Sequence, residues 1–74
     1  MTDREVLRRR IEQVYLAFHP DAGSAHGAIA WFARRCFVHP NSVSRWLSGL
    51  RKPGGAVLAL LEELERQANV EEET

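Results

Sequence analysis

Cysteine and histidine are the residue types in this chain that most readily hold a metal. Cys36 and His39 stand in a C-x-x-H spacing, and His19 and His26 are the other two histidines. Zinc sites use tetrahedral sets of Cys and His at such short spacings. Cys36, however, falls on the apolar face of its expected helix, and His19 and His26 belong to separate segments. We therefore expect no metal site.

A nucleophile, a base and a carboxylate also occur close together in the sequence. Asp21, Ser24 and His26 are the residue types of a hydrolytic triad. Such a triad is defined by its geometry, and proximity within one loop does not supply that geometry. The sequence also has no glycine-rich phosphate loop. We expect no enzymatic activity, no cofactor and no small-molecule substrate.

Polar side chains of another kind gather in residues 40–48. If this segment is a helix, Val43, Trp46 and Leu47 share one apolar face. The remaining, outward positions are polar: Asn41, Ser42, Ser44, Arg45 and Ser48. A narrow helix with short polar residues and one Arg has the width and the donors to meet base edges in a DNA major groove. This segment is the candidate for nucleic-acid chemistry.

Charge is unevenly distributed along the 74 residues, although the formal net charge is zero. Residues 22–61 hold five basic and no acidic side chains, whereas residues 62–74 hold six Glu and one Arg. Nine of the ten basic residues are Arg, whose planar fork of donors suits phosphate and guanine. The sequence therefore predicts a cationic middle and an anionic tail.

Helical signals surround this segment on both sides. Thr2 and Glu5 have the spacing of a capping box, and an apolar stripe follows at Leu7, Ile11, Val14 and Phe18. His19-Pro20 ends this first helix, because the residue before proline disfavours helical backbone. We expect the basic run Arg8-Arg9-Arg10 on this helix to be a solvated face.

Three further helices are expected. Ser24 is a suitable cap for the second, Pro40 suits the first position of the third, and Gly49 suits a helix end with positive φ. The predicted fold is an all-α, compact four- to five-helix bundle that contains a helix-turn-helix, with helices at about 3–18, 25–36, 40–48 and 56–68. We predict one domain over residues 1–69 and a frayed acidic tail over 70–74.

The run VHPNSVSRWLSG, residues 38–49, resembles the recognition helix of Xre/Cro-like helix-turn-helix regulators, whose pattern is V-S-x-x-T-V-S-R-W-L-x-G. The resemblance covers residues from about 24 to 64 and includes Ala33 and the basic turn Arg51-Lys52-Pro53. Phe37 replaces the usual turn glycine, and His39 replaces the usual Ser or Thr cap. Bulky residues rarely take a positive φ, so Phe37 must keep an ordinary φ or accept strain.

The resemblance implies sequence-specific binding of double-stranded DNA by a transcriptional regulator, in particular a repressor. The residues implied to contact bases are Asn41, Arg45, Ser44 and His39. Arg45 suits a two-pronged contact with guanine, and Asn41 suits one with adenine. The residues implied to contact phosphates and set the register are Arg34, Arg35, Ser42, Ser48, Arg51 and Lys52.

A homodimer is expected, because one recognition helix reads only a few base pairs. The helix at 56–68 has more leucine than one stripe needs, which points to Leu58 and Leu60 as dimer contacts. Trp31 lies beside the apolar face of its helix. It is either a half-buried ring that covers Ala28 or Gly27 or a further dimer contact.

A second class of function stays open at this stage, a helix-turn-helix fold used for protein assembly, such as a phage packaging subunit or an antagonist of a regulator. Zero net charge and the Glu71-Glu72-Glu73 tail favour it. No apolar run reaches the roughly 18 residues of a membrane span, and the N-terminus lacks the apolar stretch of a secretion signal. The single cysteine allows no internal disulfide. We expect no membrane partner and a cytoplasmic location in a prokaryotic or phage-infected cell.

Overall fold

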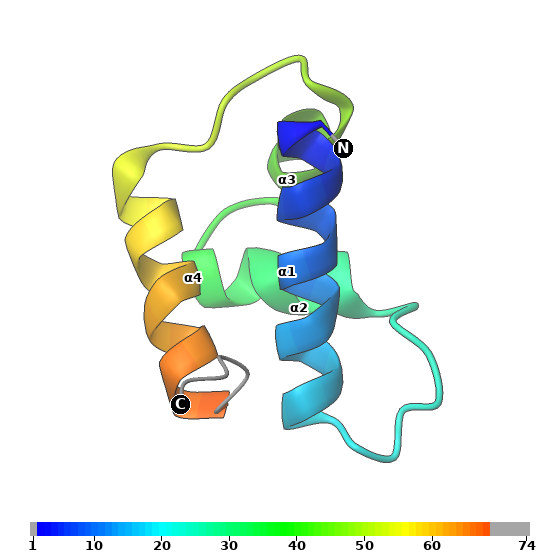
Figure 1. Ribbon diagram of the computed structural model, residues 1–74. Helices are drawn as coiled ribbons and strands as arrows, with labels where there is room; N and C mark the ends of the chain where they lie inside the picture. Colours follow the sequence, from blue (N-terminus) through cyan, green and yellow to red (C-terminus); the bar gives the residue numbers. More distant parts are fainter. Residues whose placement is uncertain (1, 69–74) are drawn as a thin grey trace.

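The computed structural model describes residues 2–68, and the expected acidic tail at 70–74 lies outside them. The described chain is all-helical, with four helices in the order α1 (Asp3–Phe18), α2 (Ala28–Cys36), α3 (Pro40–Ser48) and α4 (Gly55–Ala68). Figure 1 shows α1 and α4 running in the same direction, with α2 crossing behind α1 and α3 behind its N-terminal half. None of the helices in the described part has the length and apolarity needed to cross a membrane.

Helix α1 has the predicted bounds at both ends. The Thr2 hydroxyl accepts a hydrogen bond from the Glu5 N–H, and the Glu5 carboxylate accepts one from the Thr2 N–H, which completes the capping box. Leu7, Ile11 and Val14 are buried along the predicted stripe. His19 leaves the helical backbone at φ −132°, as expected for a residue before proline.

Helix α2 begins three residues later than predicted, and Ser24 does not cap it. The Ser24 hydroxyl instead accepts the His26 N–H at 3.4 Å, and Gly27 precedes the first helical residue. The Tyr15 hydroxyl lies 2.9 Å from the place where a Cβ of Gly27 would be. Gly27 lets the chain pass close to α1, and its weak helix propensity agrees with a helix that starts only after it.

Helix α3 has the predicted bounds and both predicted end signals. Pro40 is its first residue, and Gly49 ends it with φ 85°. Three residues, 37–39, join α2 to α3. Phe37 takes a left-handed conformation, φ 59° and ψ 41°, so the turn keeps a glycine-like shape and Phe37 adopts the strained alternative.

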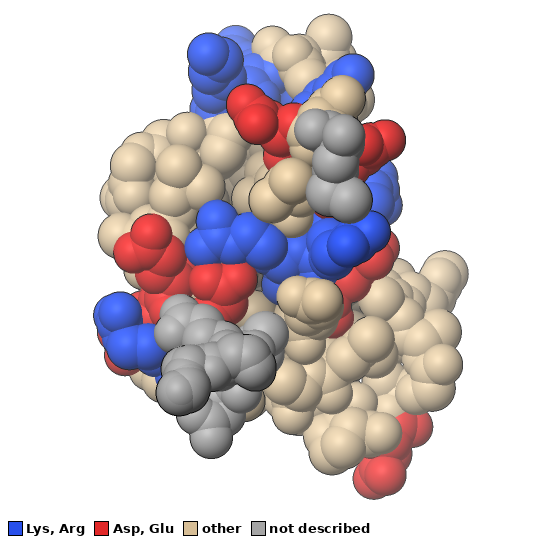
Figure 2. Space-filling model, viewed as in Figure 1, with Lys and Arg blue, Asp and Glu red and all other residues tan. Residues whose placement is uncertain are grey.

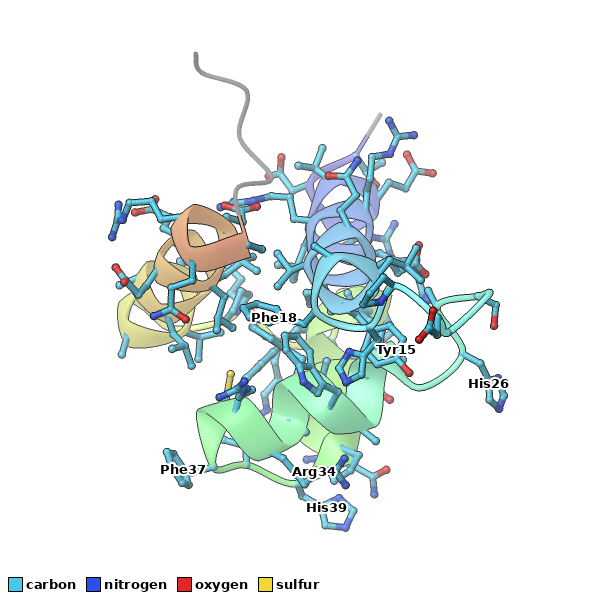
Figure 3. The ribbon with its side chains drawn as sticks, turned by 90° about the horizontal axis from the view of Figure 1, so that it is seen from below. Tyr15, Phe18, His26, Arg34, Phe37 and His39 are labelled. Carbon is cyan, nitrogen blue, oxygen red and sulfur yellow. The ribbon has the colours of Figure 1, made fainter. Side chains whose placement is uncertain are left out.

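The core lies between α1 and the other three helices. Its fully buried large side chains are Phe32, Ile11, Leu61, Val14 and Val43. Trp31 is also in the core, with 8% of its surface exposed. Its ring lies 5.8 Å from that of Tyr15 and 5.6 Å from that of Phe18, and Figure 3 shows both of these side chains pointing from α1 toward α2. The expectation of a half-buried Trp31 is therefore wrong, because this aromatic cluster covers the ring, and little of the ring is left exposed for a dimer contact.

Candidate nucleic-acid interface

The outward face of α3 is polar, and its inward face is part of the core. Val43 has no exposed surface and Trp46 is 9% exposed, as predicted. Asn41, Ser44, Arg45 and Ser48 are exposed, and their spacing places them on one side of the helix. Ser42 is half-buried at the edge of this side. We call Asn41, Ser44, Arg45 and Ser48 the polar face of α3.

His39 fixes the start of this face. Its Nδ1 accepts the Asn41 N–H at 3.0 Å, so the imidazole caps α3 in the way that Ser or Thr caps other helices. Because Nδ1 is the acceptor of this hydrogen bond, Nε2–H is the donor that the exposed His39 ring has left for another partner. A His39 that contacts DNA has Nε2–H as its donor.

The C-terminal end of α3 is tied to α1. The Arg4 guanidinium donates to the Ser48 carbonyl at 2.9 Å, and the Ser48 hydroxyl donates to the Arg45 carbonyl at 3.1 Å. Because the Ser48 hydroxyl already donates within its own helix, a phosphate contact would have to displace that hydrogen bond. Arg4 adds a cation at this end that sequence reasoning missed, because its partner lies 44 residues away.

The predicted phosphate-binding cations are all exposed, but their surroundings differ. Arg34, Arg51 and Lys52 make no side-chain ion pair or hydrogen bond with other residues of 2–68. The Arg35 guanidinium lies over the rings of Phe18 and Trp31, 5.8 and 5.5 Å from their centroids. Arg35 is therefore held on the aromatic cluster, whereas the other three cations have no such partner.

The face that carries α1 has a different charge pattern. Figure 2 shows Lys and Arg interleaved with Asp and Glu there. Arg8 lies 3.9 Å from Glu12, and Arg10 makes an ion pair with Glu65 at 2.8 Å. The expectation of a merely solvated Arg10 is wrong, since its guanidinium bonds both oxygens of a carboxylate that is largely buried. Charges on this face neutralise one another, unlike those near α3.

A groove lies where α1, the end of α3 and α4 meet. Its lining combines apolar side chains, among them Val6, Trp46 and Leu58, with charged ones, namely Asp3, Arg4, Arg10, Arg51 and Lys52. Val6 is 40% and Leu58 is 37% exposed. Leu60 is partly buried against the core. Of the three predicted dimer contacts, only Leu58 lies exposed in this structure.

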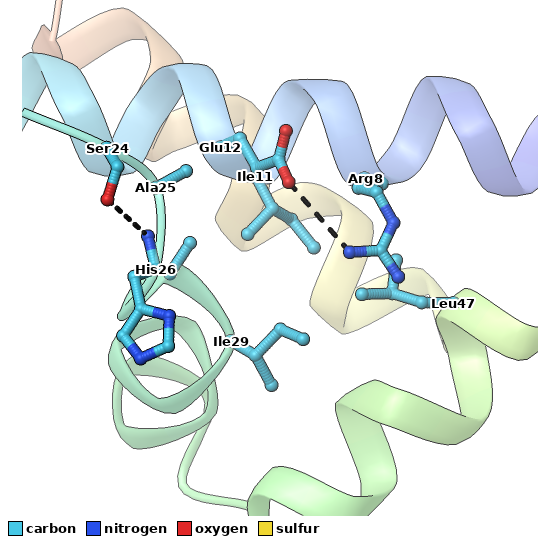
Figure 4. A pocket seen from close by; sticks show the side chains of 9 residues that line it. Arg8, Ile11, Glu12, Ser24, Ala25, His26, Ile29 and Leu47 are labelled. Carbon is cyan, nitrogen blue, oxygen red and sulfur yellow. Dashed lines mark hydrogen bonds and ion pairs between the residues drawn. The ribbon is translucent and has the colours of Figure 1, made fainter.

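A second hollow contains the serine and histidine considered for catalysis. Figure 4 shows Ser24 and His26 at its rim, beside Ile29 and opposite the Arg8–Glu12 pair. Ser24 bonds the His26 backbone N–H, and Figure 3 shows the His26 ring pointing away from the helices. The imidazole is therefore not placed to activate the hydroxyl.

Cys36 and His39 do not belong to a metal-binding cluster in the part of the chain that the structure describes. Residues 2–68 contain no group of three His, Cys, Asp or Glu side chains that could hold a metal ion. Partial burial raises the pKa of the Cys36 thiol above its ordinary value of 9.0, which favours the neutral thiol over the thiolate that metals bind.

Comparison of this chain with family models, curated proteins and solved structures gives no match. The resemblance to Xre/Cro-like regulators therefore stays a prediction from the sequence of residues 24–64.

Proposed function

We propose that this chain binds double-stranded DNA sequence-specifically, with α2 and α3 as a helix-turn-helix, and acts as a transcriptional repressor in the cytoplasm of a prokaryotic or phage-infected cell. The observation that carries the proposal is the polar face of α3. It holds Asn41 and Arg45 on the exposed side of a short helix, which the burial of Val43 and Trp46 keeps turned outward. A helix of this kind fits the major groove.

The residues of the proposed site have two roles. Arg45 donates two hydrogen bonds to the O6 and N7 of a guanine, and Asn41 pairs in the same way with an adenine. Ser44 and His39 Nε2 supply further donors to bases. Arg34, near the start of α3, and Arg51 and Lys52, after its end, bind phosphates on either side and set the register. Arg4, at the end of α3, is added to this phosphate-binding group.

The proposed active form is a homodimer. Two copies double the number of base pairs read, with half-sites about 34–36 Å apart. We assign the dimer contact to Leu58, since it is exposed whereas Leu60 is partly buried and Trp31 is buried.

The test is selection of duplexes from a random pool by the purified chain at near-physiological salt. We expect a short motif, repeated with two-fold symmetry. An Arg45→Ala variant should lose preference for the selected motif, with about 1–3 kcal/mol less discrimination at one guanine. A Lys52→Ala variant should weaken binding to all sequences alike and reduce the salt dependence by about one phosphate.

Gln67→Ala on α4 is the matched control. The Gln67 amide donates a hydrogen bond to Glu63 on the same helix, and no DNA contact is assigned to Gln67. It should bind like the unmodified chain. If no motif emerges and Arg45→Ala and Lys52→Ala bind DNA like the unmodified chain, the proposal is wrong, and the alternative of a protein-assembly module gains.

A further inference from the structure

The turn between α2 and α3 contains the one non-glycine residue with positive φ in the described part of the chain, Phe37. The left-handed conformation costs a residue with a Cβ roughly 1–2 kcal/mol. Bulky side chains are rarely found in it. Phe37 is therefore a strained residue at the entrance of the proposed recognition helix.

Two hydrogen bonds impose this conformation. The Phe37 N–H donates to the Arg34 carbonyl at 3.2 Å, and the Val38 N–H donates to the Ala33 carbonyl at 3.0 Å. The end of α3 repeats the same motif, with Gly49 N–H bonded to the Trp46 carbonyl and Leu50 N–H to the Arg45 carbonyl. Glycine is the usual residue at this position of the motif. The chain thus has glycine in one of two equivalent places and phenylalanine in the other.

The Phe37 side chain makes no packing contribution to stability that would offset this strain. It is 95% exposed, so its ring buries almost no apolar surface. By contrast, the next residue, Val38, packs against the core. A strained residue without a folding role suggests a functional one.

The position of Phe37 suggests its partner. Figure 3 shows Phe37, Arg34 and His39 on the side of the molecule that faces away from α1. Phe37 precedes the start of α3 by three residues, and the N-terminal half of a recognition helix is the part that faces the bases. Residues 22–61 around it carry basic but no acidic side chains. Basic surroundings of this kind favour a polyanion as the partner over a basic or neutral protein surface.

We propose that Phe37 contacts the C5-methyl group of a thymine in the major groove, beside the bases met by the start of α3. The inference rests on the proposed function and adds a specificity-determining residue to it. A phenyl ring has no hydrogen-bond donor or acceptor, and the thymine methyl is the apolar group that a major groove presents. The ring reads a base by burying this methyl, while Asn41 and Arg45 read by hydrogen bonding.

The test combines a change in the protein with a change in the DNA. Replacing the thymine of the selected duplex by uracil removes only the methyl group. The unmodified chain should then bind about fourfold more weakly, the value of one buried methyl. Phe37→Gly should bind the thymine duplex at least fourfold more weakly, and should bind the thymine and uracil duplexes equally.

The stability of the variant separates a lost contact from a lost fold. Phe37→Gly relieves the backbone strain, so its Tm should rise while its DNA affinity falls. Leu50→Ala is the matched control, because Leu50 is 77% exposed and follows Gly49 as Val38 follows Phe37. It should leave the affinities for both duplexes unchanged.

Several results would overturn the inference. They are a selected motif without thymine next to the α3 contacts, an unmodified chain that does not distinguish uracil from thymine, and a Phe37→Gly variant with full affinity. The last result, with normal binding by the unmodified chain, leaves the proposed function intact and points to a protein partner for Phe37. Absence of DNA binding by the unmodified chain contradicts the proposed function itself.

Discussion

Arg10 on α1 and Glu65 on α4 form a two-pronged ion pair in which both N–O distances are 2.8 Å. The Glu65 side chain is 10% exposed and that of Arg10 is 32% exposed. A carboxylate this deeply buried needs its partner, because the desolvation penalty of an unpaired buried charge exceeds the favourable energy of its packing contacts. The pair therefore fixes how α4 sits on α1.

We expect Glu65→Ala to lower the free energy of unfolding by about 1–3 kcal/mol, below the range for a fully buried pair because Arg10 is partly exposed. The combined variant Arg10→Met with Glu65→Leu should recover most of this loss, since the apolar pair leaves no buried charge. Urea unfolding measures both. A double variant no more stable than Glu65→Ala would show that the pair itself is needed.

Gly49 should be the glycine whose replacement by alanine lowers the stability of the fold most. Its φ is 85°, and the Arg4 Cδ lies 2.8 Å from the place of a Cβ. Gly49→Ala therefore adds backbone strain and displaces Arg4, with an expected loss of about 1–2 kcal/mol. Gly23→Ala has a similar φ of 76° but open space, so it shows the strain alone.

Gly54→Ala is the control for both glycine variants, because Gly54 has no positive φ and a Cβ added there would meet no atom within 4 Å. It should keep or slightly raise the Tm by reducing the freedom of the unfolded chain. Equal losses for Gly49→Ala and Gly23→Ala would mean that Arg4 moves away at no cost.

Leu58 tests the proposed dimer. A Leu58→Asp variant places a charge in the groove between α1 and α4, and because Leu58 is 37% exposed the fold should tolerate it. We expect sedimentation to show dimers of the unmodified chain and monomers of this variant. Glu62→Asp, at an exposed position on the same helix, is the control and should remain dimeric. Persistence of Leu58→Asp dimers would move the contact elsewhere.

The Cys36 thiol should lose its proton at a higher pH than an ordinary cysteine does. Partial burial raises its pKa above 9.0, so at pH 8 the folded chain should react with iodoacetamide more slowly than the chain in urea. The same shift lowers stability as the pH rises past 9, because the unfolded chain then loses this proton more readily than the folded one. Equal alkylation rates in both states would contradict the burial of this thiol.

Local signals in the sequence were sufficient for much of this fold. The capping box at Thr2, the proline after His19, Pro40 and Gly49 predict the ends of α1 and α3 correctly, because each acts within one helical turn. The inward positions of Val43 and Trp46 also follow from spacing alone.

What the sequence could not show depends on distant contacts. Glu65 reads as part of an acidic tail until its partner 55 residues earlier is known. The late start of α2 depends on Tyr15 beside Gly27, and the burial of Trp31 depends on Phe18 and Tyr15 from another helix. The sequence also allows two backbone conformations for Phe37, since the hydrogen bonds that impose the αL conformation form only when α2 ends at Cys36.

The most direct test of the proposed function is a titration of the isotope-labelled chain with its selected duplex, followed residue by residue through backbone amide signals. We predict that the largest shifts occur at His39, Asn41, Ser44 and Arg45, with smaller ones at Arg34, Ser48, Arg51 and Lys52, and little change at Glu62 and Glu63 on α4. Shifts confined to other helices, or no saturable shift at all, would contradict the assignment of α3 as the DNA-reading helix.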